Sequence, residues 1–207
     1  MLKTPEENKA HIMDLRKSNG REITEEYYQE RYERFMRYIP ERYSKVSRND
    51  IPEKVSGKPI VDGEKNGLYI YGSVGCGKTH TLYALKKYYA EKLQLIRVQN
   101  LTQVLNSIKL SFGTDDPEDI VNDYVYDDGS CLAFDDIGSE KDTEWTGEQL
   151  YRMIDHLYTN KIPCIFTSNL SLKDLASRYG EIQGDRIASR LAEMLTVIHL
   201  EGKDRRL

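Results

Sequence analysis

Gly72-Ser73-Val74-Gly75-Cys76-Gly77-Lys78-Thr79 decides the fold of this 207-residue chain. The stretch follows the apolar run Leu68–Tyr71, and apolar residues recur at helical spacing after it. Its three glycines let backbone N–H groups approach an anion closely, and a helix that begins near Lys78 directs its positive end to the same point. The sequence therefore predicts a triphosphate-binding loop between a strand and a helix.

Two side chains of this loop carry specific tasks in binding ATP and Mg²⁺. We expect the Lys78 ammonium to reach the β- and γ-phosphates, and the Thr79 hydroxyl to be a magnesium ligand. The candidate nucleotide contacts are the whole loop and the residue after it, namely Gly72, Ser73, Val74, Gly75, Cys76, Gly77, Lys78, Thr79 and His80.

Short apolar runs alternate with amphipathic stretches from Leu68 onward. This alternation is typical of an α/β protein in which helices cover both faces of a parallel sheet. Ligands of such sheets bind at the carboxyl ends of the strands, where the phosphate loop is also expected. The predicted strands are Leu68–Tyr71, Leu95–Gln99, Cys131–Asp135, Pro163–Ser168 and Leu195–Leu200.

Composition narrows the class of protein. The formal net charge of -4 lacks the basic excess of a typical nucleic-acid-binding protein. No apolar run approaches the ~18 residues that span a bilayer, and the N-terminus lacks the apolar stretch of a signal peptide. The three cysteines stand singly, which argues against a zinc site or a disulfide framework. We therefore expect a cytoplasmic protein without a membrane partner.

The residues before the phosphate loop predict a helix and a connector. The helix runs from about Thr24 to before Pro40, and its stripe packs either on the ATPase core or on a partner. Basic residues gather between Arg31 and Arg48, either as a solvated helix face or as a contact for phosphates or an acidic partner. Prolines and glycines mark 47–66 as a connector. The apolar stripe of the helix comprises Tyr28, Tyr32, Phe35, Met36 and Ile39.

Two adjacent carboxylates end the third predicted strand. Asp135 is the expected magnesium ligand, and Asp136 is placed to polarise the attacking water. Many P-loop ATPases have a glutamate at the second position, so Glu140 is an alternative group to position the water. A strand that runs into an acidic turn would give the same pattern without chemistry.

Polar residues further along the chain complete the predicted catalytic set. Asn169 follows a buried strand and is expected to orient water against the γ-phosphate, unless it only caps a helix or forms an Asx turn. Arg186 and Arg190 lie four apart on a predicted helix, and such arginines are often surface charge. An arginine finger, which in oligomeric ATPases comes from the next subunit, is the functional interpretation of Arg190.

Together these segments resemble AAA+ ATPases, and among them the bacterial helicase loaders of the DnaC and DnaI type and the related IstB transposition ATPases. Gly72–Thr79 looks like their Walker A motif. Asp135–Glu140, with Trp145 after it, looks most like the DnaI version of the acidic motif. Phe166–Asn169 looks like sensor 1, and Arg186–Leu191 resembles box VII.

Single residues acquire roles through this resemblance. Arg190 matches the arginine finger of box VII. The segment Glu201–Arg206 resembles the loader C-terminus, where Arg205 matches the sensor 2 arginine, with Arg206 a near rival. The segment Ile39–Tyr43 is similar to the one that leads into the nucleotide pocket of these loaders.

The resemblance implies a three-layer αβα P-loop fold with the parallel strand order 5-1-4-3-2. Residues 47–207 would form the AAA+ domain, and residues 1–46 a small helical extension whose first helix lies between Thr4 and Gly20. Loaders of the DnaI type carry a larger, zinc-binding docking domain in place of that extension. The implied activity is ATP hydrolysis with Mg²⁺ in DNA replication. The implied partners are a replicative DNA helicase, single-stranded DNA and further copies of the chain, joined through Arg190.

The sequence leaves three alternatives open. An IstB-like transposition helper would share every active-site motif, bind duplex DNA and act with a transposase. A small-molecule P-loop kinase would need a substrate pocket and a lid, and has no use for Asn169 together with Arg190. A nucleotide-gated scaffold would bind ATP with little turnover.

Overall fold

A five-stranded parallel sheet forms the centre of the computed structural model, which describes residues 6, 7, 9, 10, 24–61, 63–110, 125 and 129–202. The strand order is β2-β3-β4-β1-β5. This is the predicted order 5-1-4-3-2 counted from the opposite edge, so the predicted topology is confirmed. The strands are β1 Gly67–Tyr71, β2 Ile96–Asn100, β3 Cys131–Ile137, β4 Cys164–Ser168 and β5 Thr196–His199.

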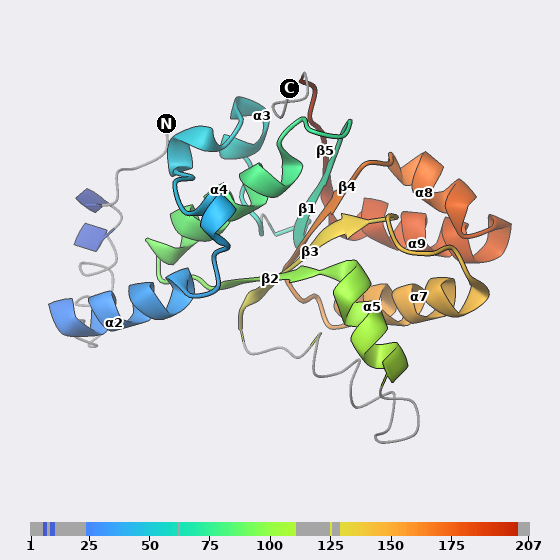
Figure 1. Ribbon diagram of the computed structural model, residues 1–207, viewed down its shortest axis with the longest axis horizontal. Coiled ribbons are helices and arrows are strands. Elements are labelled where there is room, and N and C mark those ends of the chain that lie inside the picture. The colour runs from blue at the N-terminus through green and yellow to red at the C-terminus, as the bar shows by residue number, and fades with distance from the viewer. Residues whose placement is uncertain are drawn as a thin grey trace.

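Helices cover both faces of the sheet, as Figure 1 shows. One layer contains α2 (Glu25–Met36), α3 (Glu53–Ser56) and α4 (Lys78–Ala90). The other contains α5 (Leu101–Leu110), α7 (Glu144–Thr159), α8 (Leu172–Arg178) and α9 (Glu181–Met194). Two short 3₁₀ turns, η1 (Glu41–Tyr43) and η2 (Arg48–Asp50), precede α3. Among the helices in these ranges, none is both long and apolar enough to cross a membrane.

Two hydrophobic cores, one on each face of the sheet, hold the layers together. Successive strand residues point to opposite faces, so Leu68 and Ile70 pack toward α4 whereas Tyr69 packs toward α7 and α9. All three side chains are fully buried. Each buried aliphatic side chain of this size contributes roughly 1.5–3 kcal/mol to folding. The alternation therefore explains the three-layer αβα architecture.

Helix α2 packs on α4, and the predicted connector contains local structure. Tyr28 is buried, and its hydroxyl donates to the Glu91 carbonyl at 2.8 Å. Burial raises the pKa of Tyr28 to about 12.

The connector 47–66 includes η2 and α3, because Ile51 and Val55 are buried in the core beside α4. The helix predicted between residues 4 and 20 lies largely outside the described residues.

The packing of α8 on α9 depends on the absence of a side chain at Gly184. A Cβ atom there would lie 1.9 Å from the carbonyl oxygen of Ala176 on α8. We expect Gly184→Ala to push the helices apart and to lower the free energy of unfolding by about 1–3 kcal/mol in urea titrations. Gly147→Ala on α7 is the matched control, because its Cβ would meet only ordinary contacts from 3.5 Å. Equal losses in both variants would contradict this account of the packing.

Candidate active site

The predicted phosphate loop connects β1 to α4. Gly75 and Gly77 have φ angles of 79° and 103°, which favour glycine strongly over any residue with a Cβ. Gly72 permits a close approach instead, since a Cβ atom there would lie 2.1 Å from the Leu200 carbonyl oxygen. The glycines therefore shape a backbone loop at the N-terminus of α4, where N–H groups and the helix dipole favour an anion.

Lys78 is the buried cation of this loop, with only 7% of its surface exposed. Its ammonium donates to the carbonyl oxygens of Gly72 and Ser73, each at 2.9 Å, and to Asn169 Oδ1 at 2.7 Å. A buried charge requires such partners. The structure thus brings Lys78 and Asn169, ninety-one positions apart in the chain, into direct contact.

Thr79 and Asp135 meet at the carboxyl end of β3. The Thr79 hydroxyl lies 3.1 and 3.0 Å from the two carboxylate oxygens of Asp135. Burial raises the pKa of Asp135, whereas hydrogen bonds from Thr167 and Thr79 oppose that shift. A hydroxyl and a carboxylate in contact are the oxygen donors that Mg²⁺ prefers, so the two residues predicted as metal ligands fit that ion.

Asp136 lies on an irregularity of β3 that the sequence did not indicate. The strand continues to Ile137, two residues beyond its predicted end, and its register against β4 shifts between Phe134 and Ile137. Asp136 has a φ of 66°, a left-handed conformation that aspartate tolerates better than most residues. Its Oδ1 accepts from Asn169 Nδ2 at 3.1 Å. The bulge therefore turns Asp136 toward Asn169.

Thr167 on β4 is a site residue that the sequence reasoning missed. Its hydroxyl donates to Asp135 Oδ1 at 2.5 Å and accepts from the Asp136 N–H at 2.9 Å. It therefore holds both acidic residues in place. The available signal was the pair of hydroxyl residues, Thr167 and Ser168, that ends a fully buried strand.

The phosphate loop, Asp136 and Asn169 border a pocket of about 380 Å³, whose lining does not include Asp135 or Thr167. The segment Ile39–Tyr43, which the resemblance placed near the nucleotide, contributes Arg42 and Tyr43 to the lining. The Tyr43 ring stacks on Tyr83 with 4.5 Å between centroids. His80 Nε2 lies 3.4 Å from Asp50 Oδ1. The lining consists of Arg42, Tyr43, Val74, Gly75, Gly77, Lys78, Thr79, His80, Asp136 and Asn169.

Glu140, the alternative group for positioning water, points elsewhere. Its carboxylate accepts from the Gly138 N–H at 3.2 and 3.0 Å, and the residue is only 3% exposed. Burial raises its pKa. Arg178 also donates to its backbone carbonyl. Glu140 therefore fixes the turn after β3, and Asp136 is the acid that lines the pocket.

Arg190 does not line the pocket of its own chain. It lies on α9, and its Nη2 is 2.6 Å from Asp155 Oδ1 on α7. Arg186 is exposed on the same helix, one turn earlier. Arg205 and Arg206 lie outside the described residues.

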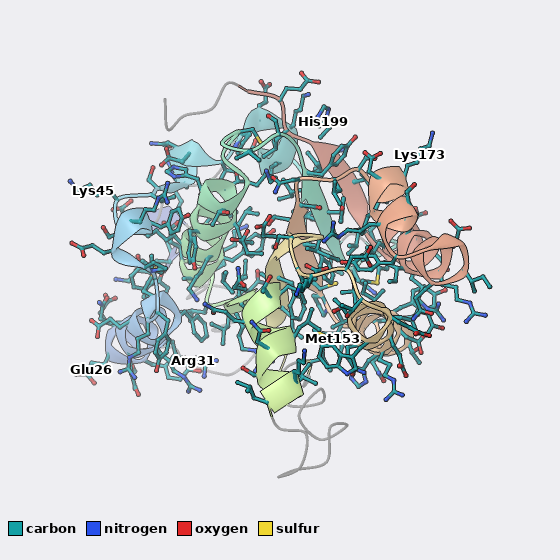
Figure 2. The ribbon with its side chains drawn as sticks, turned by 45° about the vertical axis from the view of Figure 1, so that its right-hand side comes forward. Glu26, Arg31, Lys45, Met153, Lys173 and His199 are labelled. Carbon is teal, nitrogen blue, oxygen red and sulfur yellow. The ribbon has the colours of Figure 1, made fainter. Side chains whose placement is uncertain are left out.

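The basic stretch is mostly solvated. Arg34, Arg37 and Lys45 are exposed, and Lys45 projects outward in Figure 2. Arg31 instead lies over the ring of Phe35, with its guanidinium carbon 5.0 Å from the centroid. Of these basic residues, only Arg42 lines the pocket beside the phosphate loop in the described part of the chain.

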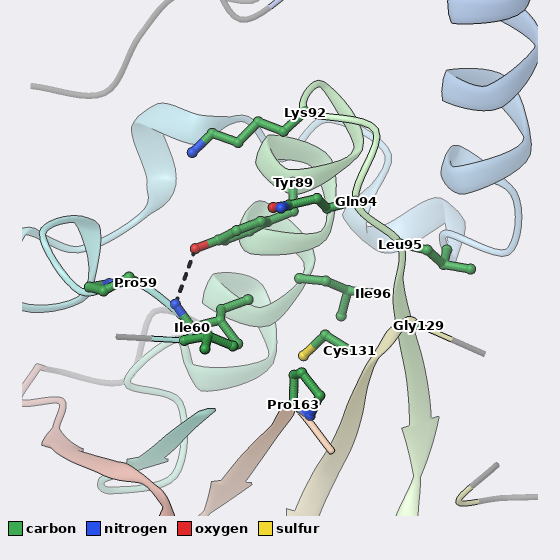
Figure 3. Close-up of a pocket in the computed structure, with 11 residues that line it drawn as sticks. Pro59, Ile60, Tyr89, Lys92, Gln94, Leu95, Ile96, Gly129, Cys131 and Pro163 are labelled. Carbon is green, nitrogen blue, oxygen red and sulfur yellow. Dashed lines mark hydrogen bonds between the residues drawn. The ribbon is translucent and has the colours of Figure 1, made fainter. Parts of the chain in front are cut away.

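A second pocket, of about 320 Å³, lies at the amino ends of the strands (Figure 3). Its wall includes Cys131, the first residue of β3, and Tyr89, whose hydroxyl accepts from the Ile60 N–H at 3.4 Å. Burial raises the pKa of the Cys131 thiol, which makes it a poor nucleophile. Its described lining includes none of the predicted nucleotide contacts.

The sequence matches a known family of ATPase domains. The model of the bacterial DnaA ATPase domain matches residues 31–197. The chain belongs to this family. It is an AAA+ ATPase domain protein related to the DnaI and DnaC helicase loaders and to DnaA.

One curated relative is the replicative helicase loader DnaI of Bacillus subtilis (strain 168). It is 28% identical over 153 residues, which cover 70% of this chain and 49% of the relative. The chain thus spans about half the length of that protein.

Solved structures share the fold. The crystal structure of DnaI superposes with a TM-score of 0.64 at 21% identity, covering 82% of this chain and 95% of that one. The DnaC helicase loader gives 0.62 at 24% identity, with coverages of 78% and 99%. A DnaA structure bound to AMPPCP and single-stranded DNA gives 0.54 at 20% identity, with coverages of 66% and 40%.

Proposed function

We propose that this AAA+ protein is a helicase-loader ATPase that binds and hydrolyses ATP and delivers a replicative DNA helicase to single-stranded DNA. One observation carries the enzymatic part of this proposal. The pocket at the carboxyl edge of the sheet joins the phosphate loop to Asp136 and Asn169 through direct hydrogen bonds. Those groups are the ones that phosphoryl transfer to water requires.

The loop and Lys78 would hold the triphosphate. Backbone N–H groups at the N-terminus of α4 would bind phosphate oxygens, and Lys78 would exchange its carbonyl partners in the loop for the β- and γ-phosphates. His80 and Tyr43 line the same pocket and would contact the base or ribose of the nucleotide.

Thr79 and Asp135 would hold Mg²⁺, as their contact and their oxygen donors suit that ion. When bound, Mg²⁺ neutralises charge on the phosphates. Thr167 keeps the Asp135 carboxylate oriented by its own hydrogen bond.

Asp136 and Asn169 would act on the attacking water. Asn169 touches both Lys78 and Asp136, so it lies between the phosphate-binding cation and the acid. Asp136 accepts the proton of the water while Asn169 orients that water. Arg190 would complete the site of a neighbouring copy, and Arg205 would act as the sensor 2 arginine. Gly72, Ser73 and Cys76, which are not among the residues that line the pocket, would complete the backbone of the phosphate loop.

We expect Asp136→Asn to bind ATP normally and to hydrolyse it about 100-fold more slowly. Asparagine keeps the volume and can still accept from Asn169, but it cannot take the proton. Fluorescent-nucleotide titration and phosphate release measure the two properties separately. Asp142→Asn, an exposed acid outside the pocket, is the matched control. Undiminished turnover in Asp136→Asn would show that another group positions the water.

A helicase loader and a transposition helper differ in the protein that each binds. The likeness to DnaI supports a replicative helicase, whereas an IstB-like helper would share the same site and act with a transposase. Full-length protein, tagged and mixed with native lysate with and without ATP, should retain a replicative helicase in a nucleotide-dependent way. Recovery of a transposase instead would replace the loader proposal, and Lys78→Ala is the nucleotide-blind control.

A further inference from the structure

We propose that Asp155 and Tyr151 are positioning residues that hold the Arg190 guanidinium ready for ATP bound in a second copy of this chain. The inference rests on the proposed role of Arg190 in a neighbouring site. It assigns a task to two residues of α7 that the motifs do not include.

The contacts around Arg190 fix its head group from two directions. Asp155 Oδ1 lies 2.6 Å from Nη2, and the guanidinium carbon lies over the Tyr151 ring, 4.6 Å from its centroid. Tyr158 offers a second ring at 5.7 Å. Since residues at i, i+4 and i+7 share one helical face, α7 presents all three side chains to α9.

A further hydrogen bond connects the two helices that carry these contacts, α7 and α9. The Tyr158 hydroxyl donates to Glu193 Oε1 at 2.6 Å, which joins α7 to α9 less than one turn after Arg190. The Arg190 side chain is nevertheless 24% exposed, so it reaches the surface. Its Nε is buried without a hydrogen-bond partner in the described part of the chain. The Nε end of the guanidinium is therefore enclosed by protein, while Nη2 pairs with an Asp155 side chain that is 42% exposed.

Holding the guanidinium in advance suits an arginine finger. A free arginine loses extensive rotamer freedom when it is fixed, and catalysis by preorganised charge requires that loss before the reaction. A guanidinium has five N–H donors, so one contact with Asp155 leaves donors for a phosphate. The opposite role for Asp155 is sequestration, in which the ion pair keeps Arg190 from its target. The two roles predict changes of opposite sign.

The experiment uses mixed full-length variants in which one copy supplies the finger and the other the nucleotide site. Arg190→Ala protein has an intact phosphate loop and no finger. Lys78→Ala protein has a finger and a disabled loop, so it acts only as donor. Phosphate release is measured while donor is titrated to saturation, which separates the maximal rate from the half-saturating donor concentration.

Asp155→Asn is then placed in the donor or, as the matched control, in the acceptor, which has no Arg190 to hold. In the donor we expect the maximal rate to fall about 10–100-fold, because a misplacement near 1 Å costs about that much. The half-saturating concentration should stay unchanged. The same substitution in the acceptor should have no effect on the maximal rate.

Tyr151 provides a second test that does not depend on one substitution. Tyr151→Phe keeps the ring and should retain stimulation by the donor, whereas Tyr151→Ala should lower the maximal rate severalfold. Thermal unfolding of each donor checks that it is folded.

A higher maximal rate with Asp155→Asn donor would establish sequestration and overturn the proposal. Equal losses from donor and acceptor, or a change only in half-saturating concentration, would overturn it in favour of a structural role. Absence of stimulation by the unaltered donor, with wild-type protein still hydrolysing ATP, would refute the trans role of Arg190 and positioning with it. No hydrolysis by wild type would refute the proposed ATPase itself.

Discussion

Lys78→Ala should lose affinity for ATP by about 100-fold or more, because it removes the one buried cation of the phosphate loop. The structure adds a second consequence. Lys78 also bonds the carbonyl oxygens of Gly72 and Ser73, so its loss disturbs the loop as well as the charge. Titration with a fluorescent ATP analogue measures the affinity. Wild-type affinity in this variant would refute the site.

Lys86→Met is the matched control for Lys78→Ala. Lys86 is also buried on α4, but its ammonium donates to the Ile96 carbonyl at 2.9 Å, away from the pocket. Burial lowers its pKa to about 8. Its replacement should change the unfolding temperature and leave nucleotide affinity near the wild-type value.

Arg190→Ala should bind ATP with near-normal affinity and hydrolyse it about 10³-fold more slowly at high protein concentration. Its own phosphate loop is intact, and Arg190 does not line its own pocket. Mixing it with Lys78→Ala should restore part of the activity. Phosphate release by each protein and by the mixture measures the effect.

Arg186→Ala is the control on the same helix, since Arg186 is exposed one turn earlier. It should hydrolyse ATP at a rate close to that of wild type. Complementation by the Arg186 variant and not by the Arg190 variant would place the arginine finger one turn earlier. No complementation by either would make Arg190 a structural partner of Asp155.

The sequence predicted the sheet and the phosphate loop because both depend on local patterns. The alternation of apolar runs and amphipathic stretches predicted a parallel sheet, whereas its strand order came from the resemblance to AAA+ ATPases. Each strand bound lies within two residues of its predicted position. The connector 47–66 contains a short helix, α3, that its sequence did not indicate. Its prolines and glycines suggested a loop, but α3 forms because Val55 is buried against distant residues. Short helices gain stability from such tertiary contacts, which a local pattern does not contain.

The site contacts that were not predicted from the sequence depend on how strands and helices pack against one another. Thr167 joins Asp135 to Asp136 only because β3 and β4 are neighbours and β3 bulges. The pairing of Arg190 with Asp155 likewise depends on how α7 and α9 pack. Lys78, Thr79 and Asp135 were predictable because their spacing from a strand end fixes where they lie.

The most direct measurement is phosphate release by wild-type protein with ATP and Mg²⁺ over a range of protein concentrations, beside Lys78→Ala purified in the same way. Release should exceed that of the Lys78→Ala protein, and specific activity should rise with concentration as copies complete one another's sites. Release no greater than that of Lys78→Ala at every concentration would contradict the account.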